Sequence, residues 1–171
     1  MYALIEMNAF TKYSKTDDYT TPVEYLKIID KFIPKDKLVV DGFWNEGDVQ
    51  YYWEEQLGRK IWHQPTDFFE TTYPSDSIFV SNPPFSKINE ILISLFERGN
   101  QFALLLPIQK IAQLKVQKIL LPHQEHLQMI VSDVYCGFIK DGQQTRCPSQ
   151  YFCWFTYKFN LPRDLMWVGE N

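Results

Sequence analysis

The chain has 171 residues, 45% of them hydrophobic and 16% aromatic, and a formal net charge of −4. These values predict one globular domain, 1–171, with a sizeable core, and they argue against a disordered chain or a tight, autonomous nucleic-acid binder, which would be basic. Because no apolar run has membrane-span length, no leader pattern opens the chain, and the three cysteines show neither disulfide nor metal-ligand spacing, we expect a cytoplasmic protein without a membrane partner or a metal.

The first predicted element is a helix that begins near Pro22. Thr21 is a suitable N-cap, Pro22 suits the first helical position, and Glu24 completes a capping box. Apolar residues then recur at helical spacing until Pro34 ends the helix.

A strand, a turn and a helix follow. Residues 37–41 are typical of a buried parallel strand, residues 42–48 of a turn, and residues 49–55 of a helix that Gly58 closes. Residues 59–63 predict a second strand. This order is typical of the first half of a nucleotide-binding α/β unit.

Residues 76–86 carry the most specific chemistry. The apolar strand 78–80 runs into Ser81-Asn82-Pro83-Pro84-Phe85. The two prolines fix their own φ angles and push each preceding residue out of the helical region, so Asn82 should lie in stiff, extended backbone at a strand end. The amide oxygen of Asn82 and the carbonyl oxygen of Pro83 can accept from one planar amine, and Phe85 can stack on the ring that carries this amine.

The remaining elements complete an α/β layout. A helix over 86–99 capped by Gly99, a strand over 102–107 and a helix over 108–120 come first. Strands over 127–131, 134–139 and 151–159 follow, with a turn at 140–143. We therefore expect a mostly parallel, doubly wound sheet with an antiparallel terminal hairpin.

The segment Ser81–Phe85 resembles the Asp/Asn/Ser-Pro-Pro-Tyr/Phe catalytic motif of the S-adenosylmethionine-dependent amino-methyltransferases. That family methylates adenine or cytosine amines, or glutamine side chains. The resemblance covers roughly residues 19–111 and implies a Rossmann-like class I methyltransferase fold. It also implies S-adenosylmethionine as cofactor and a catalytic set of Asn82, Pro83, Pro84 and Phe85, with Asn82 also near the cofactor.

Two earlier segments are similar to cofactor-binding parts of the family. Tyr19, Thr21 and Pro22 stand where a segment closes over the cofactor. Residues 41–47 resemble an Asp-Pro-Phe-x-Gly-x-Gly loop, in which Asp41, Phe43 and Gly47 match. Two positions depart from it, because Gly42 replaces the proline and Asn45 the first glycine.

Two later segments complete the implied cofactor site. Gln64 stands where an acidic residue usually holds the ribose hydroxyls, and it could accept one hydroxyl hydrogen bond. Asp67 and Phe68 resemble a motif whose aspartate accepts from the adenine amine of the cofactor, while the next backbone N–H contacts the adenine ring.

The preferred substrate is the N6 amine of adenine in DNA or RNA, because an aromatic residue after Pro-Pro can stack on a flipped or unpaired base. One alternative is a glutamine amide, which the acidic charge favours. Another is a catalytically inactive, methyltransferase-like binding subunit, which Gly42, Asn45 and the absent acid after the second strand favour.

The partners follow from charge and size. We expect weak nucleic-acid binding by the isolated chain, and recognition supplied by another subunit or by a homo-oligomer. The polar segment 142–150, with Arg146, resembles a loop that fits the substrate in this family, or it is an ordinary hairpin loop.

Overall fold

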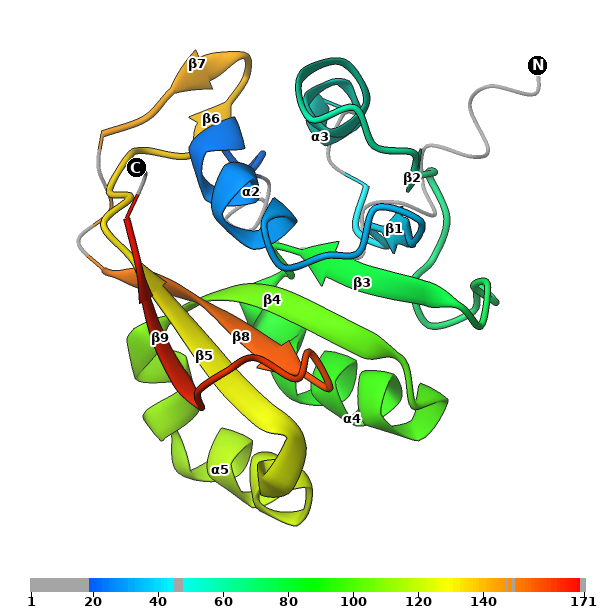
Figure 1. Cartoon of the computed structure of the whole chain (residues 1–171), viewed down its shortest axis with the longest axis vertical. Coiled ribbons are helices and arrows are strands. Elements are labelled where there is room, and N and C mark those ends of the chain that lie inside the picture. Colours follow the sequence, from blue (N-terminus) through cyan, green and yellow to red (C-terminus); the bar gives the residue numbers. More distant parts are fainter. Residues whose placement is uncertain (1–18, 45–47, 147, 149, 170–171) are drawn as a thin grey trace.

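The computed structural model describes residues 19–44, 48–146, 148 and 150–169. Its centre is a seven-stranded sheet, with helices on both faces (Figure 1). The strands are β1 (Leu38–Val40), β2 (Ile61–Trp62), β3 (Ser77–Ser81), β4 (Gln101–Pro107), β5 (Leu127–Ser132), β8 (Phe152–Tyr157) and β9 (Leu165–Val168). They lie in the order β2-β1-β3-β4-β8-β5-β9.

Most neighbours in this sheet are parallel. Strands β2, β1, β3 and β4 pair in parallel, β8 is antiparallel to both β4 and β5, and β9 is parallel to β5. A separate antiparallel hairpin joins β6 (Ile139–Lys140) and β7 (Gln143–Gln144). The predicted doubly wound, mostly parallel sheet and its antiparallel hairpin are confirmed.

Helices cover the two faces of the sheet. On one face lie α2 (Val23–Asp30) and α3 (Asp48–Tyr51), which a π-helical turn (Tyr52–Gln56) continues. On the other lie α4 (Ile88–Arg98), after a 3-10 turn (Phe85–Lys87), and α5 (Leu114–Leu120), between 3-10 turns (Ile108–Ala112 and Leu121–His126). Neighbouring strand residues point to opposite faces, so Ile78 and Val80 pack in the first core and Phe79 in the second.

The order of the strands creates a switch point between β1 and β3. From β1 the chain moves outward to β2, and from β3 it moves the other way to β4, so the connections leave this pair in opposite directions. The carboxyl ends of β1 and β3 lead directly into Asp41 and Asn82. Ligands of open α/β sheets bind in the crevice at such a point.

The predicted capping box at Thr21 is wrong. The N-cap of α2 is Pro22, and no side chain hydrogen-bonds the cap. The preceding segment is instead fixed by backbone pairing, because Thr20 N–H donates to Ile139 O (2.8 Å) and Ile139 N–H donates to Thr20 O (3.0 Å).

Other boundaries differ for tertiary reasons. The predicted helix 108–120 is interrupted at Gln113, whose ψ of 132° is extended. Residues 134–138 lie outside any strand, and β9 had not been predicted. Strand β9 gains its partner from β5, with Val131 aligned to Trp167, a pairing that local sequence does not encode.

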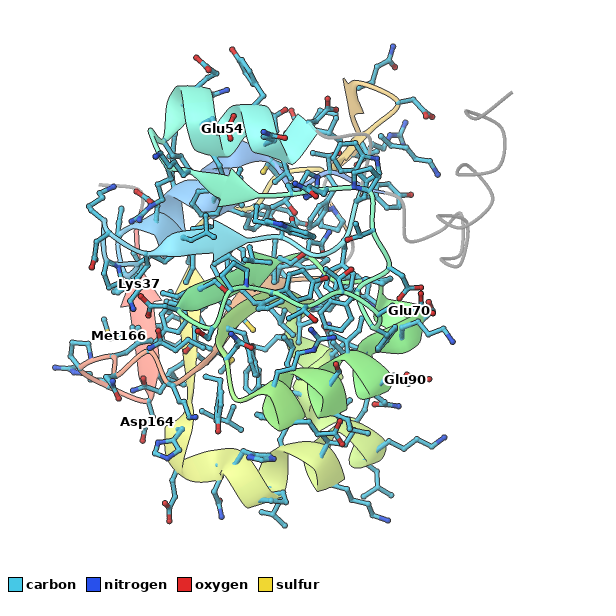
Figure 2. All side chains as sticks on the ribbon, turned by 90° about the vertical axis from the view of Figure 1, so that its right-hand side faces the viewer. Lys37, Glu54, Glu70, Glu90, Asp164 and Met166 are labelled. Carbon is cyan, nitrogen blue, oxygen red and sulfur yellow. The ribbon has the colours of Figure 1, made fainter. Side chains whose placement is uncertain are left out.

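Side chains fill the space between the sheet and its helices, and acidic residues such as Glu54, Glu70 and Glu90 project from the surface (Figure 2). Within the described residues, no helix has the length and apolarity needed to cross a membrane. The same residues contain no group of three or more histidine, cysteine or acidic side chains placed to hold a metal ion.

Candidate active site

Asp41 links the ends of the two strands at the switch point. Its Oδ1 accepts from the backbone N–H of Phe43 (3.1 Å) and from the hydroxyl of Ser81 (2.5 Å). Burial raises the pKa of the Asp41 carboxyl above its usual range, and nearby His63 and the two hydrogen bonds offset part of this rise. Asp41 therefore fixes the loop after β1 against the end of the strand that carries Asn82.

An aromatic stack lies at the carboxyl end of β2. The imidazole of buried His63 is stacked against the indole of Trp44, with ring centroids 4.7 Å apart. His63 Nδ1 lies 3.1 Å from Asp41 O. Gln64, the next residue, is exposed. At the position where the resemblance predicts a ribose-binding group, the chain thus has the amide of Gln64. The adjoining imidazole of His63 is covered by Trp44.

Phe43 and Phe68 are core residues. Their side chains are 3% and 0% exposed, and their rings stack with centroids 4.7 Å apart. The Phe68 ring cannot also stack on a ligand, so its backbone N–H remains as the group that the resemblance assigns to the cofactor. A Cβ at Gly42 would lie 2.8 Å from Tyr73 Oη and 3.0 Å from Phe68 Cδ2. This aromatic packing explains why glycine stands there.

Asp67 begins a tight turn. Its Oδ1 accepts from Phe69 N–H (2.8 Å), and its carbonyl oxygen accepts from the N–H (3.1 Å) and the hydroxyl (2.6 Å) of Thr71. An aspartate that hydrogen-bonds the backbone two residues on forms an Asx turn. The turn gives the half-buried Asp67 a fixed direction.

A cavity of about 340 Å³ adjoins Asn82. It is lined by Tyr19, Asn82, Phe85, Phe138, Thr145, Arg146, Pro148 and Phe152. Asn82 Oδ1 is buried and has no hydrogen-bond partner among the described residues. A buried acceptor without a partner costs free energy, so this atom is suited to accept from a ligand.

The cavity unites predicted residues with others that the sequence did not reveal. Tyr19, Asn82 and Phe85 come from distant segments and were expected here. Phe138 and Phe152 were not expected in this cavity. Their ring centroids lie 4.8 Å apart, and the ring centroid of Phe152 lies 6.0 Å from that of Phe85. Phe138 falls outside any strand, and no local pattern distinguishes it from other core phenylalanines.

The other predicted residues are not among those that line this cavity. Pro83 and Pro84 are buried next to Asn82. Thr21 is 5% exposed, and Pro22 lines a second cavity, of about 420 Å³, with acidic Glu24 and Asp48. Asn45 and Gly47 lie outside the described residues.

No protein-family model and no curated protein matches the chain. A protein of Listeria monocytogenes assigned as a class I S-adenosylmethionine-dependent methyltransferase superposes with a TM-score of 0.52 at 8% identity, over 97% of this chain and 70% of that one. Precorrin-6Y C5,15-methyltransferase of Geobacter metallireducens superposes with a TM-score of 0.50 at 10% identity, over 85% and 94%.

The chain has the class I methyltransferase fold. At these identities the similarity concerns the fold alone. The sheet follows the doubly wound plan, in which a parallel set of strands is followed by one antiparallel strand, β8, inserted between β4 and β5. Within this fold, Asp41 follows β1 and Asn82 follows β3. Asp67 lies in the connection from β2 to β3.

Proposed function

We propose that the chain is an S-adenosylmethionine-dependent methyltransferase that acts on an exocyclic amine of a flat ring, namely the N6 amine of adenine in DNA or RNA. The observation that carries this proposal is Asn82 Oδ1, a buried acceptor without a described partner, beside the ring of Phe85 in the 340 Å³ cavity. The fold and the order of the motifs along the chain support it.

The residues of the structure fit the cofactor with one exception. Asp67 and the backbone N–H of Phe68 would hold its adenine, Gln64 its ribose, and Tyr19 with Pro22 would close over it. The exception is the end of β2, where Trp44 stacks on His63 and the described residues 63–65 include no carboxylate for the ribose hydroxyls. When bound, S-adenosylmethionine supplies an electrophilic methyl group.

The chain contributes mainly position and polarity. Asn82 Oδ1 accepts from the substrate amine, and Phe85 holds the ring that carries this amine, which orients the nitrogen lone pair. The described lining residues include no carboxylate or imidazole. We therefore infer that the surplus proton of the methylated amine leaves to water and not to a protein base.

The lining of the cavity favours a nucleotide over a glutamine side chain. Four aromatic rings, those of Tyr19, Phe85, Phe138 and Phe152, line the cavity. Phe138 is buried and stacks on Tyr25, so the half-buried rings of Tyr19, Phe85 and Phe152 are those that can contact a base. Arg146 supplies a cation at the same cavity, and its described lining carries no negative charge. An aromatic ring with an attached phosphate matches this combination better than an amide on an alkyl chain.

A second candidate function is that of a catalytically inactive binding subunit. It is favoured by the stack of Trp44 on His63, which occupies the end of β2 where the cofactor ribose would be held.

Calorimetric titration with S-adenosylmethionine separates the two candidates, because the enzyme must bind the cofactor. Radiolabelled methyl transfer to single-stranded DNA, single-stranded RNA and a glutamine peptide then identifies the acceptor. We expect cofactor binding and transfer to a nucleic acid. Absence of cofactor binding would support the inactive subunit, and transfer to the peptide alone would replace the nucleotide proposal.

A further inference from the structure

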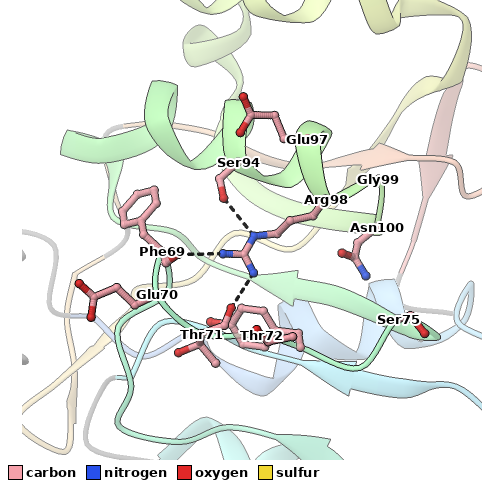
Figure 3. A pocket seen from close by; sticks show the side chains of 11 residues that line it. Phe69, Glu70, Thr71, Thr72, Ser75, Ser94, Glu97, Arg98, Gly99 and Asn100 are labelled. Atoms are coloured by element: carbon pink, nitrogen blue, oxygen red, sulfur yellow. Dashed lines mark hydrogen bonds between the residues drawn. The ribbon is translucent and has the colours of Figure 1, made fainter.

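Arg98, in the last turn of α4, binds the loop that contains Asp67. Its guanidinium donates to three carbonyl oxygens of that loop, those of Thr71 (2.8 Å), Phe68 (2.9 Å) and Phe69 (3.3 Å). Its Nε donates to Ser94 Oγ (3.0 Å) in the helix. Figure 3 shows the guanidinium between α4 and this loop, at the wall of a cavity of about 580 Å³.

The same guanidinium lies over two aromatic rings. Its Cζ is 5.1 Å from the ring centroids of both Phe68 and Tyr73, which is cation–π range. Phe68 stacks in turn on Phe43, and Tyr73 Oη is the atom that a Cβ at Gly42 would meet first. A chain of direct contacts thus runs from Arg98 to the loop after β1.

Arg98 is not needed to cap its own helix. An arginine near a helix C-terminus commonly serves the last carbonyl groups of that helix. Here Gly99, with φ of 71°, supplies the cap, and its N–H donates to Leu95 O and Phe96 O at 3.1 Å each. The two terminal nitrogens of Arg98 instead donate to a loop 27 to 30 residues earlier in the chain.

We propose that Arg98 is a positioning residue for cofactor binding. It holds residues 67–71, and through Phe68 the loop after β1, in the geometry in which Asp67 meets the cofactor. The inference rests on the proposed function. Lysine is not equivalent to this arginine, because the planar guanidinium presents five donors in a fixed fork, whereas the ammonium group is a compact charge with three donors on a flexible stem.

The test compares Arg98→Lys with a matched control, Arg59→Lys. Arg59 also donates to carbonyl oxygens, those of Pro34 (2.8 Å) and Ile33 (2.5 Å), and pairs with Asp30, but it serves the connection between α2 and β1. Affinity for S-adenosylmethionine is measured by calorimetry, and melting temperature by circular dichroism.

We expect Arg98→Lys to raise the cofactor dissociation constant about tenfold, or about 1.4 kcal/mol. Arg59→Lys should lower the melting temperature and leave the dissociation constant within about twofold of wild type, because distant sites behave independently. Unchanged affinity in Arg98→Lys, or an equal loss in Arg59→Lys, would overturn the inference. Should Arg98→Lys not fold, Ser94→Ala replaces it, since it removes only the Nε acceptor; affinity unchanged there would overturn the inference too.

A double-mutant cycle with Asp67→Ala tests the route of the effect. If Arg98 acts by aiming Asp67, Arg98→Lys should cost little further affinity once Asp67 is alanine. A full tenfold loss in the Asp67→Ala background would show that Arg98 acts by another route. Failure of the proposed function is recognised separately, because the wild-type chain would then show no cofactor binding at all.

Discussion

At the scale of single residues, burying the charge of Asp41 costs free energy, and its hydrogen bonds explain why a carboxylate stands there. A buried carboxylate at a strand end holds Phe43 N–H and the Ser81 hydroxyl, which joins the loop after β1 to the strand leading to Asn82. The pKa of its carboxyl is raised because desolvation by burial outweighs the effects of nearby His63 and of these two hydrogen bonds. The link is geometric, and the charge itself is destabilising.

Asp41→Asn should therefore change the pH dependence of stability. Because the folded pKa lies above the ordinary 3.8, the contribution of this group is fully present below about 3.8 and is lost as pH rises through the folded pKa. Asparagine keeps an acceptor and has no charge, so the stability of the variant relative to wild type should increase with pH across that window.

Urea unfolding between pH 3.5 and pH 8 measures this, with exposed Asp36→Asn as the control for a surface charge. A stability difference that stays constant over the whole range would contradict the proposed cost of the Asp41 charge.

Arg146 offers a second test at this scale. If its cation meets a substrate phosphate, Arg146→Gln should weaken substrate binding and leave cofactor affinity unchanged. Loss of one phosphate contact should also reduce the slope of log affinity against log salt by about 0.7 for a single strand. Exposed Arg163→Gln is the matched control. An unaltered salt slope in Arg146→Gln would remove Arg146 from the substrate site.

At the scale of elements, local chemistry predicted the ends of segments well. The Pro-Pro pair ends β3 where expected, and Gly99 closes α4 in the left-handed conformation. The aromatic walls of the cavity and the stack of Trp44 on His63 could not be predicted, because they join segments that meet only in the folded sheet. The same holds for Arg98, which on sequence alone is an ordinary cation at a helix end.

The loop after β1 gives the prediction for this scale. Asn45, which lies outside the described residues, stands where the amino-methyltransferases that the chain resembles usually have glycine. Asn45→Gly should strengthen cofactor binding or leave it unchanged, because glycine would meet any need of the loop for a left-handed residue without strain and would clear space near the methionine moiety. Stability can fall slightly through the unfolded chain, so affinity is the quantity to measure.

Asn160→Gly is the control for this substitution. Asn160 has φ of 53° in an exposed loop remote from the switch point, so glycine there should not change affinity. A tenfold loss of affinity in Asn45→Gly, about 1.4 kcal/mol, would show that the asparagine side chain itself contacts the cofactor.

At the scale of the whole molecule, the net charge and the charge at the candidate site have opposite signs. The net charge of −4 opposes nonspecific attraction to nucleic acid, yet the described lining of the Asn82 cavity carries Arg146 and no acid. Acidic residues line two further cavities among the described residues, with Glu24 and Asp48 in one and Glu70 and Glu97 in the other. We therefore expect weak binding to long duplexes and recognition of a single exposed base.

The most direct test of the central claim is single-turnover methyl transfer to single-stranded DNA or RNA by wild type and Asn82→Ala, with cofactor affinity measured in parallel. We predict that the variant binds S-adenosylmethionine nearly as well as wild type but transfers the methyl group about 10²–10³-fold more slowly. This is the cost of removing one preorganised hydrogen-bonding group, about 2.7–4 kcal/mol. Asn89→Ala, on α4 outside the described lining of the cavity, should retain full activity. Wild-type turnover in Asn82→Ala would contradict the assignment of this cavity as the site of methyl transfer.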